Sequence, residues 1–480
     1  MKNVSHRRYA MLFTALTIYT SLVFSVDCNA EASHTSIHLL AANGKLTGTT
    51  IATSIPGYSG SGYATGFISS ADQLSFQFPA RAGLYTITIR YSSPAGPKGY
   101  GMVVDGQTMS GMFAATGQVW ASSDAGIVRL NNGVNTLSIG GGWNYYDIDA
   151  VSLQPTSPMA PPKLPAETLS DPKATPQARA LFHSLVSMYG KQTGSGCYSM
   201  KDAAYIFTKS GAAPMLVGGD LMDYSPSRIA HGAHPEGTVQ KLIADANKGY
   251  DITLSWHWNA PMHLIDKSYT SKDGKLVVSH WWSGFYTYAT TFNVQQALAN
   301  HNSPEYKALL QNIGAIAMQL KKFQADHIPI LWRPLHEAEG GWFWWGAHGP
   351  DAFKQLWHLL YNRLTNYYGI HNLIWVYTSG GNMDWYPGNK YVDIVGVDAY
   401  PKSQDDPLTS LYQQMMHEFN GHKLLVISEF GGVPNIPLMR SYGEYWDYFV
   451  SWGGTTESAT DKALKHTYTS KYVKDHPALD

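Results

Sequence analysis

The chain shows two patterns of apolar and polar residues, separated by a proline-rich stretch at residues 154–176. Residues 35–153 contain short segments in which apolar and polar residues alternate, such as LSFQF, YTITIRY, GMVVDG and NTLSIGG, with Gly, Asn and Asp turns between them. Alternation with a period of two places every second side chain on the same face of a strand. This part of the chain is therefore predicted to form an antiparallel β-sandwich.

Residues 177–480 instead alternate apolar strands with helical stretches. Strand candidates begin at residues 191, 214, 251, 328, 372, 393, 423 and 448, and stretches such as YKALLQNIGAIAMQLKKFQADH lie between them. Eight strand–helix units predict an α/β fold class, namely a (β/α)8 TIM barrel preceded by the all-β sandwich. A doubly wound open sheet is the alternative. The barrel is favoured because polar and aromatic residues gather at the C-terminal end of nearly every strand.

The segment between these two patterns, QPTSPMAPPKLPAETLSDPKATP, is rich in proline. Proline at this density sustains neither a helix nor a central strand. Residues 154–176 are therefore predicted to be a semi-rigid linker between the sandwich and the barrel domain.

The first 30 residues have the pattern of a secretory signal peptide. Basic residues precede the apolar run AMLFTALTIYTSLVFSV, and small residues follow it, so cleavage is expected near Ala30. A membrane anchor is the alternative, although Thr, Tyr and Ser interrupt the run. Asp27 before Cys28 argues against a lipoprotein signal. We expect a secreted, extracellular protein in which Cys197 is the remaining cysteine, so no internal disulfide forms.

The composition narrows the range of partners. The net charge is −1, so nucleic acid and, after signal cleavage, membrane surfaces are poor candidates. Charged residues make up only 14% of the chain and aromatic residues 13%, with 31 tyrosines. This balance is typical of a protein that binds a neutral ligand with flat faces, and we expect it to act as a monomer.

Two glutamates follow barrel strands at the face where such barrels hold their active sites. Glu337 follows the fourth strand in WRPLHEAEGGWFWWG, and Glu429 ends the seventh in VISEFG. Two carboxylates that reach one pocket are what glycosidic bond cleavage needs: one protonates the leaving oxygen and the other attacks the sugar or activates water. Glu339 is a weaker candidate because the chain enters a loop after Glu337.

These two segments resemble the signature segments of glycoside hydrolase family 26, whose typical members are secreted endo-β-1,4-mannanases. The similarity extends across SWHWNAP, WWSGFYTYATTFNV, LIWVYTSG, DWYPG and DIVGVDAY. The resemblance implies a retaining (β/α)8 hydrolase with Glu337 as general acid/base and Glu429 as nucleophile. The two carboxylates suffice for this reaction, so no metal or organic cofactor is expected for catalysis.

The resemblance also assigns supporting roles around the two glutamates. His336 lies at the catalytic centre, Tyr400 is expected to donate to the nucleophile, and Arg333 is expected to bind the same carboxylate and lower its pKa. His257 matches a residue of the glycone subsite, and Trp342 matches a tryptophan that lines the −1 subsite. Further aromatic residues are expected to stack on sugar rings, although any one of them could be a core residue instead: Trp281, Trp282, Phe285, Trp345, Trp385 and Trp452.

Residues 35–153 resemble a family 35 carbohydrate-binding module in the phrase AGLYTITIRYS and the ending GGWNYYDIDAVSL. Trp143, Tyr145 and Asp147 are the candidates for sugar contact, against the simpler interpretation that Trp143 only closes the sandwich. Such modules often carry calcium. Leu40 and Ala42 stand where carboxylates are usual, so a calcium ion in the sandwich is expected to lack two ligands.

The sequence thus predicts a secreted, retaining endo-β-1,4-mannanase that acts on β-mannan polysaccharides and manno-oligosaccharides. Two alternatives remain. The same fold could cleave mixed-linkage β-glucan or β-1,3-xylan, or the chain could be a catalytically inactive polysaccharide-binding protein.

Overall fold

The computed structural model describes residues 35–272 and 274–477. The predicted signal peptide at residues 1–30 lies outside these residues. By their internal contacts, the described residues from Ser36 onward form one compact unit. Among the described residues, no helix has the length and apolar content needed to cross a membrane.

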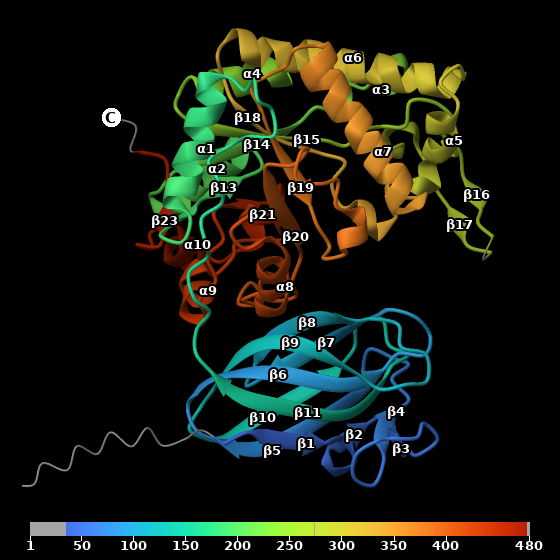
Figure 1. Cartoon of the computed structure of the whole chain (residues 1–480), viewed down its shortest axis with the longest axis vertical. Helices are drawn as coiled ribbons and strands as arrows, with labels where there is room; N and C mark the ends of the chain where they lie inside the picture. The colour runs from blue at the N-terminus through green and yellow to red at the C-terminus, as the bar shows by residue number, and fades with distance from the viewer. Residues whose placement is uncertain (1–34, 273, 478–480) are drawn as a thin grey trace, which may run out of the picture. The chain divides into compact units, whose positions relative to one another are not determined.

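The N-terminal part is a sandwich of two antiparallel sheets (Figure 1). One sheet contains β1 (Ile37–Leu40), β3 (Thr50–Ala52), β4 (Tyr63–Thr65), β6 (Gly83–Ser92), β9 (Ala121–Leu130) and β11 (Asp147–Thr156). The other contains β2 (Lys45–Thr47), β5 (Gln73–Ala80), β7 (Lys98–Val104), β8 (Gln107–Phe113) and β10 (Gly133–Gly140). The predicted alternation is visible in β6, where Tyr85, Ile87, Ile89 and Tyr91 are buried.

Aromatic rings fill the centre of the sandwich. Phe113 stacks between Tyr91 and Tyr100, with centroid distances of 4.2 Å to each ring. Tyr146 meets the edge of the same phenylalanine at 5.1 Å. Contacts of this kind stabilise a sheet pair beyond the apolar area that they bury.

The C-terminal part is a closed barrel of parallel strands, which confirms the predicted fold class. Its strands, in order around the barrel, are β13 (Gly196–Cys197), β14 (Leu216–Asp220), β15 (Asp251–Trp256), β18 (Ile330–Pro334), β19 (Leu373–Thr378), β20 (Ile394–Ala399), β21 (Leu424–Phe430) and β22 (Phe449–Ser451). Each lies within or overlaps a strand candidate from the sequence. The described residues also form the short pairs β12 (Thr193–Gly194) with β23 (Val473–Lys474) and β16 (Tyr269–Thr270) with β17 (Leu276–Val277).

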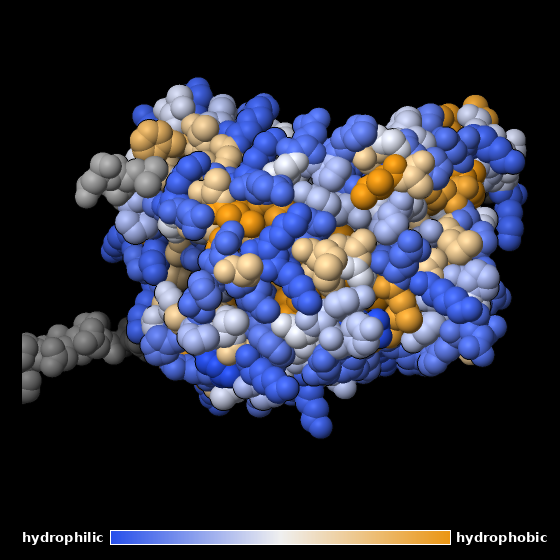
Figure 2. Space-filling view, turned by 90° about the horizontal axis from the view of Figure 1, so that it is seen from above, coloured by the Kyte–Doolittle hydropathy of each residue, from blue (hydrophilic) through white to orange (hydrophobic). Residues whose placement is uncertain are grey.

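Helices connect and surround the barrel strands (Figure 1). They are α1 (Pro176–Met188), α2 (Met200–Ser210), α3 (Pro226–Ala230), α4 (Thr238–Ala246), α5 (Val294–Ala299), α6 (Pro304–Ala325), α7 (Gly349–Tyr361), α8 (Thr409–Phe419), α9 (Ile436–Tyr442) and α10 (Asp461–Tyr468). Figure 2, which views the molecule from the end that bears α4 and α6, shows a mostly hydrophilic surface with smaller apolar patches.

The longest of these helices, α6, illustrates why the sequence folds in this way. Ser303 caps its N-terminus by accepting a hydrogen bond from the Tyr306 amide, and Pro304 occupies the first turn, where no backbone donor is needed. Leu309, Ile313 and Ile316 recur at helical spacing and are fully buried. The helix therefore packs one apolar stripe against the barrel.

The proline-rich segment at residues 154–176 is fastened to the barrel by its backbone amides. The Ser170 amide donates to Asp393 at 2.5 Å, and the Lys163 amide donates to Asn420 at 2.8 Å. The second Asp393 oxygen accepts from the Trp375 amide in β19 at 2.8 Å. One buried carboxylate thus joins this segment to the N-terminal end of the barrel strands.

Candidate active site

Three carboxyl groups meet at the C-terminal end of the barrel strands. Glu429 belongs to β21, Asp398 to β20, and Glu337 follows β18 by three residues. One oxygen from each lies within 4.8 Å of one oxygen from each of the others. The β20–β21 pairing shifts register between Val397 and Asp398, which sets Asp398 opposite Glu429. Such a bulge re-aims side chains beside a site.

The loop that carries Glu337 has an unusual backbone. Leu335 has φ 53° and Glu337 has φ 52°, so two non-glycine residues adopt the left-handed region within one turn. Each such residue costs of order 1 kcal/mol or more and persists only where its surroundings hold it. The turn lifts Glu337 out of the strand, and the Trp342 indole donates to its carboxylate at 3.0 Å.

Glu429 is almost fully buried and is held by two donors. Arg333 donates through Nη2 to one oxygen, and the Tyr400 hydroxyl donates to the other at 2.6 Å. The second arm of the guanidinium, Nη1, donates to Asp398 at 2.9 Å. Ser428 also donates to Asp398, at 2.6 Å. Arg333 therefore bridges two buried carboxylates, a geometry that its planar fork allows and a lysine ammonium does not.

The proton distribution follows from these contacts. Burial and the Asp398 charge raise the pKa of Glu337 to about 7, against the opposing charge of Arg333. Burial also raises the pKa of Glu429, while Arg333 and Tyr400 oppose that rise. Because Glu429 contacts a permanent cation and Glu337 does not, a single proton shared by the pair is better placed on Glu337.

The two histidines named by the sequence lie side by side beneath this group. His257 follows β15, and its Nε2 lies 3.1 Å from Nε2 of His336. The other nitrogen of His257 is hydrogen-bonded to Asp220 at the end of β14. Burial holds the pKa of His336 well below its usual range, with the charges of Arg333 and His257 acting in the same direction. His336 is therefore neutral.

The aromatic candidates divide into exposed and buried groups. Trp342 and Trp282 are 45% and 47% exposed, and Trp281 meets Trp282 edge-on at 5.7 Å. Phe285 and Trp452 flank His257, with centroid distances of 5.1 and 5.8 Å. Trp342, which contacts Glu337, therefore offers an exposed ring beside the catalytic group on which a sugar can stack, whereas His231 covers Trp281 and His280 covers Trp282.

Other predicted site residues take structural places instead. Trp385 lies in the barrel core and packs against Phe353 at 5.6 Å, because the short 3-10 helix Met383–Trp385 turns it inward; its assignment to substrate is corrected. Trp345 is fully buried and donates to the His336 carbonyl at 2.9 Å. Glu339 accepts from the amide of Gly380 at 2.6 Å and so anchors the loop after β19.

The sequence interpretation did not single out Asp398 or Asp220. Both end barrel strands, as Glu429 does, and Asp398 stands two residues before Tyr400 in DIVGVDAY. The rule that active sites lie at strand C-terminal ends could have named them. Their partners, Arg333 and His257, come from other strands and are visible only in the fold.

In the sandwich, two of the three sugar-contact candidates are accessible. Trp143 and Tyr145 are 64% and 57% exposed, and Tyr145 adopts a left-handed φ of 61°. Lys98 lies over the Tyr145 ring at 5.6 Å. Asp147 is buried and accepts from the Thr65 hydroxyl at 2.5 Å, so the candidate role of its side chain in sugar contact is corrected.

The carboxylate that could hold a cation in the sandwich already has protein partners. Asp149 is fully buried and pairs with Arg90. Its oxygens also accept from the amide and hydroxyl of Ser59, at 2.6 and 2.8 Å. With Leu40 and Ala42 in place of acidic residues, this donor set does not fit calcium, which needs several free oxygen ligands.

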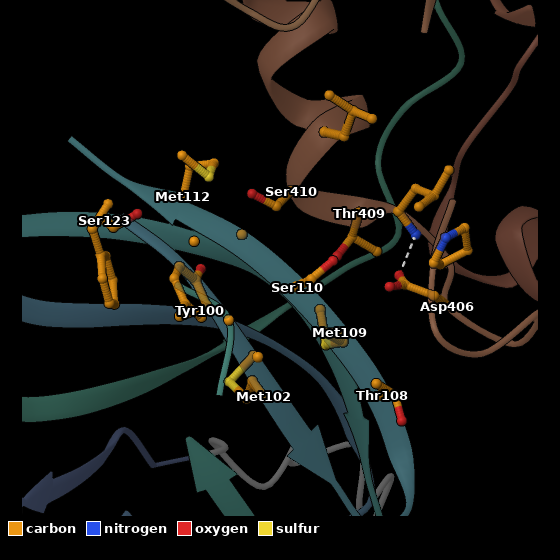
Figure 3. Close-up of a pocket in the computed structure, with 18 of the residues that line it drawn as sticks. Tyr100, Met102, Thr108, Met109, Ser110, Met112, Ser123, Asp406, Thr409 and Ser410 are labelled. Carbon is orange, nitrogen blue, oxygen red and sulfur yellow. Dashed lines mark hydrogen bonds between the residues drawn. The ribbon is translucent and has the colours of Figure 1, made fainter. Parts of the chain in front are cut away.

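A pocket of about 1210 Å³, part of whose lining is drawn in Figure 3, reaches Asp398 at the edge of the catalytic group. Met109 lines it from β8 and Thr409 from the start of α8. Its lining reaches Tyr400 but includes neither Glu337 nor Glu429. The catalytic centre is therefore defined by its contacts and not by this pocket.

Comparison with known proteins agrees with this geometry. The profile of glycosyl hydrolase family 26 matches residues 170–476. The chain belongs to glycosyl hydrolase family 26. The profile of carbohydrate binding module family 35 matches residues 39–156. The resemblance stated from the sequence motifs is thus confirmed, and the chain is a glycoside hydrolase.

Two similar proteins cover nearly the whole chain, and a third covers about two thirds of it. A mannan endo-1,4-beta-mannosidase of Thermothelomyces thermophilus is 41% identical, over 92% of this chain and 90% of its own length. The crystal structure of a Podospora anserina GH26-CBM35 β-(1,4)-mannanase is 39% identical, covers 92% of this chain and 97% of that chain, and has a TM-score of 0.64. A termite-symbiont β-mannanase complexed with gluco-manno-oligosaccharide is 29% identical, covers 65% of this chain and 97% of that chain, and has a TM-score of 0.56.

Arg333 gives the first prediction, since its charge opposes the rise in the Glu429 pKa. Arg333→Met should raise that pKa further, so the acidic limb of the pH profile of kcat/KM should move to higher pH. Loss of the bridging contact should also lower kcat/KM about 100-fold at the optimum. Arg333→Lys should fall between, because an ammonium cannot bridge both carboxylates in the same way. The exposed change Arg81→Met is the matched control, and an unchanged acidic limb in Arg333→Met would contradict this account.

Proposed function

We propose that this family 26 chain is a retaining endo-β-1,4-mannanase that cleaves internal β-1,4-mannosidic bonds of mannan, glucomannan and galactomannan. The observation that carries the proposal is the pair formed by partly buried Glu337 and buried Glu429, whose carboxylate oxygens approach within 4.8 Å. Retaining glycosidases hold their two carboxyl groups about 5 to 5.5 Å apart, whereas inverting enzymes leave room for a water molecule. The relatives named mannan endo-1,4-beta-mannosidase support the choice of substrate.

In the first chemical step, Glu337 donates its proton to the glycosidic oxygen while Glu429 attacks the anomeric carbon. The bond to the leaving sugar breaks, and a covalent glycosyl–enzyme forms. In the second step, Glu337, now ionised, removes a proton from water, which attacks the same carbon and releases Glu429. Two inversions return the original anomeric configuration.

The neighbouring side chains prepare these steps. Arg333 and Tyr400 favour the ionised form of the Glu429 carboxylate. Because each binds one of its oxygens, they also fix the orientation of the carboxylate for attack. The Trp342 indole holds the Glu337 carboxyl at the mouth of the site and offers its exposed ring to a sugar. The paired carboxylates supply both proton transfer and nucleophile, so the proposed reaction needs no cofactor.

The remaining parts of the chain fit the degradation of a polysaccharide outside the cell. We infer that residues 1–30 direct secretion, that the sandwich binds polysaccharide through Trp143 and Tyr145, and that the enzyme acts as a monomer. An exposed tryptophan beside a tyrosine gives two faces for sugar stacking. The barrel would then act on chains that the sandwich holds nearby.

The direct test is sugar release from glucomannan, galactomannan, barley β-glucan and β-1,3-xylan by wild type and Glu337→Gln. We expect release from the two mannans, and a loss of at least about 100-fold in the variant, because an amide cannot donate the acid proton. Glu457→Gln, an exposed change of the same kind, is the matched control and should be as active as wild type. Release from β-glucan or xylan alone would overturn the substrate, and full activity of Glu337→Gln would overturn the acid.

A second test concerns the sandwich. Trp143→Ala should weaken retention of the enzyme on insoluble mannan several-fold, since stacking on an aromatic ring contributes about 1 kcal/mol. Hydrolysis of soluble manno-oligosaccharides should be unchanged because the substitution leaves the barrel intact. Val134→Ala, another exposed sandwich change, provides the control in a pull-down on insoluble mannan. Unaltered retention of Trp143→Ala would contradict the assigned binding role.

A further inference from the structure

Three buried side chains are linked in series, and the last of them, His336, directly precedes the acid Glu337. Asp220, His257 and His336 come from the C-terminal ends of β14, β15 and β18, so the series crosses three neighbouring strands of the barrel. Asp220 binds Nδ1 of His257, and Nε2 of His257 lies 3.1 Å from Nε2 of His336. Nothing in the reaction itself requires Asp220, which touches neither glutamate.

Asp220 begins the series because it is surrounded by donors. Its Oδ1 accepts from the amides of Met222 and His257, at 2.7 and 3.1 Å. Its Oδ2 accepts from the hydroxyls of Tyr198 and Ser255, at 2.9 and 3.1 Å, and from His257 Nδ1. Burial opposes ionisation, yet the charge and hydrogen bonds of His257, together with the Tyr198 hydroxyl, lower the pKa of Asp220 to about 2. The ionised carboxylate accepts at both oxygens and donates at neither.

The ionised carboxylate fixes where the ring protons lie. His257 must carry a proton on Nδ1 in order to donate to Asp220. Nε2 of His257 is then the nitrogen that meets Nε2 of His336, and one proton lies between these two atoms. Nδ1 of His336 has no hydrogen-bond partner among the described residues. The contact with His257 is therefore the polar interaction that sets the ring orientation of His336.

His336 occupies the middle of the strained turn. Leu335 before it and Glu337 after it both have left-handed φ angles. The His336 carbonyl accepts from the Trp345 indole at 2.9 Å, while its ring is held by His257. The turn is thus fastened at two points, one on the backbone and one on the side chain, directly before the acid.

We propose that Asp220 is a positioning residue that acts through His257 and His336 to hold the strained turn and so aim the acid/base Glu337 at the glycosidic oxygen. The inference rests on the proposed function of Glu337. It assigns to the barrel a support chain that begins two strands away from the acid. These three linked side chains stabilise the strained turn at Leu335–Glu337, whose backbone would otherwise relax to a different conformation.

Asp220→Asn tests this with little change in volume. If the NH2 group of the asparagine faces the two hydroxyls, it can donate to Tyr198 and Ser255. The same NH2 group then faces the proton on Nδ1 of His257, so two donors meet. In the opposite orientation the NH2 group faces the amide protons of Met222 and His257. In either orientation two donors face each other unless the proton on Nδ1 of His257 moves. The hydrogen bond between His257 and His336 is therefore altered.

The readout is the dependence of kcat/KM on the leaving group, measured with aryl β-mannobiosides whose phenols range from phenol to 2,4-dinitrophenol. A good leaving group departs without acid assistance and a poor one needs it. We expect Asp220→Asn to lose about 100-fold with phenol, the magnitude of an acid misplaced by about 1 Å, and to approach the wild-type rate with dinitrophenol. His257→Gln, which leaves the Asp220 carboxylate in place, should show the same pattern, and the exposed change Glu457→Gln should resemble wild type.

Glu337→Gln separates the two possible failures. If Glu337→Gln shows strong leaving-group dependence and Asp220→Asn loses activity uniformly, or not at all, then Asp220 does not position the acid. If Glu337→Gln itself shows no such dependence, then Glu337 is not the acid and the proposed function is wrong. Circular dichroism and thermal unfolding identify a variant that fails to fold, in which case His257→Gln decides the positioning role on the same criterion.

Discussion

The site depends on the contact of one permanent cation with two buried carboxylates. Transfer of each isolated ion from water into the barrel costs several kcal/mol, so Glu429 and Asp398 are tolerated together only because Arg333 donates to both. The same contact separates the roles of the two glutamates. The guanidinium opposes the rise in the pKa of Glu429, while Glu337, at the edge of the group, can hold a proton near neutral pH.

The barrel makes this contact possible by bringing distant segments together. Arg333 and Glu429 are 96 residues apart in sequence, yet both lie at the C-terminal end of parallel strands in one closed sheet. Rigid strands hold the nucleophile and its donors, whereas the acid lies on a strained turn just beyond a strand. Glu429 is therefore held by donors that other barrel strands supply. Glu337, which lies outside the strands, depends on support from His336 and Trp342.

Much of this arrangement could be predicted from the sequence because it follows strand periodicity. The eight barrel strands could be predicted from their apolar runs. The two glutamates could be predicted because they end two of these runs, in WRPLHE and VISEF. The orientation of single side chains outside strands is not readable in this way. Trp385 packs in the core within a short 3-10 helix, and Asp147 is buried against Thr65, although Trp143 and Tyr145 close to it in sequence are exposed. The importance of Asp220 arises from five donors that only the fold assembles.

The central claim is that two closely spaced carboxylates cleave the bond by double displacement. Proton NMR of the first products from a soluble manno-oligosaccharide, recorded before mutarotation, tests this most directly. The account predicts that the newly formed reducing end appears first as the β-anomer and then equilibrates. Initial appearance of the α-anomer would show inversion, and Glu429 would then be a base that activates water and not the nucleophile.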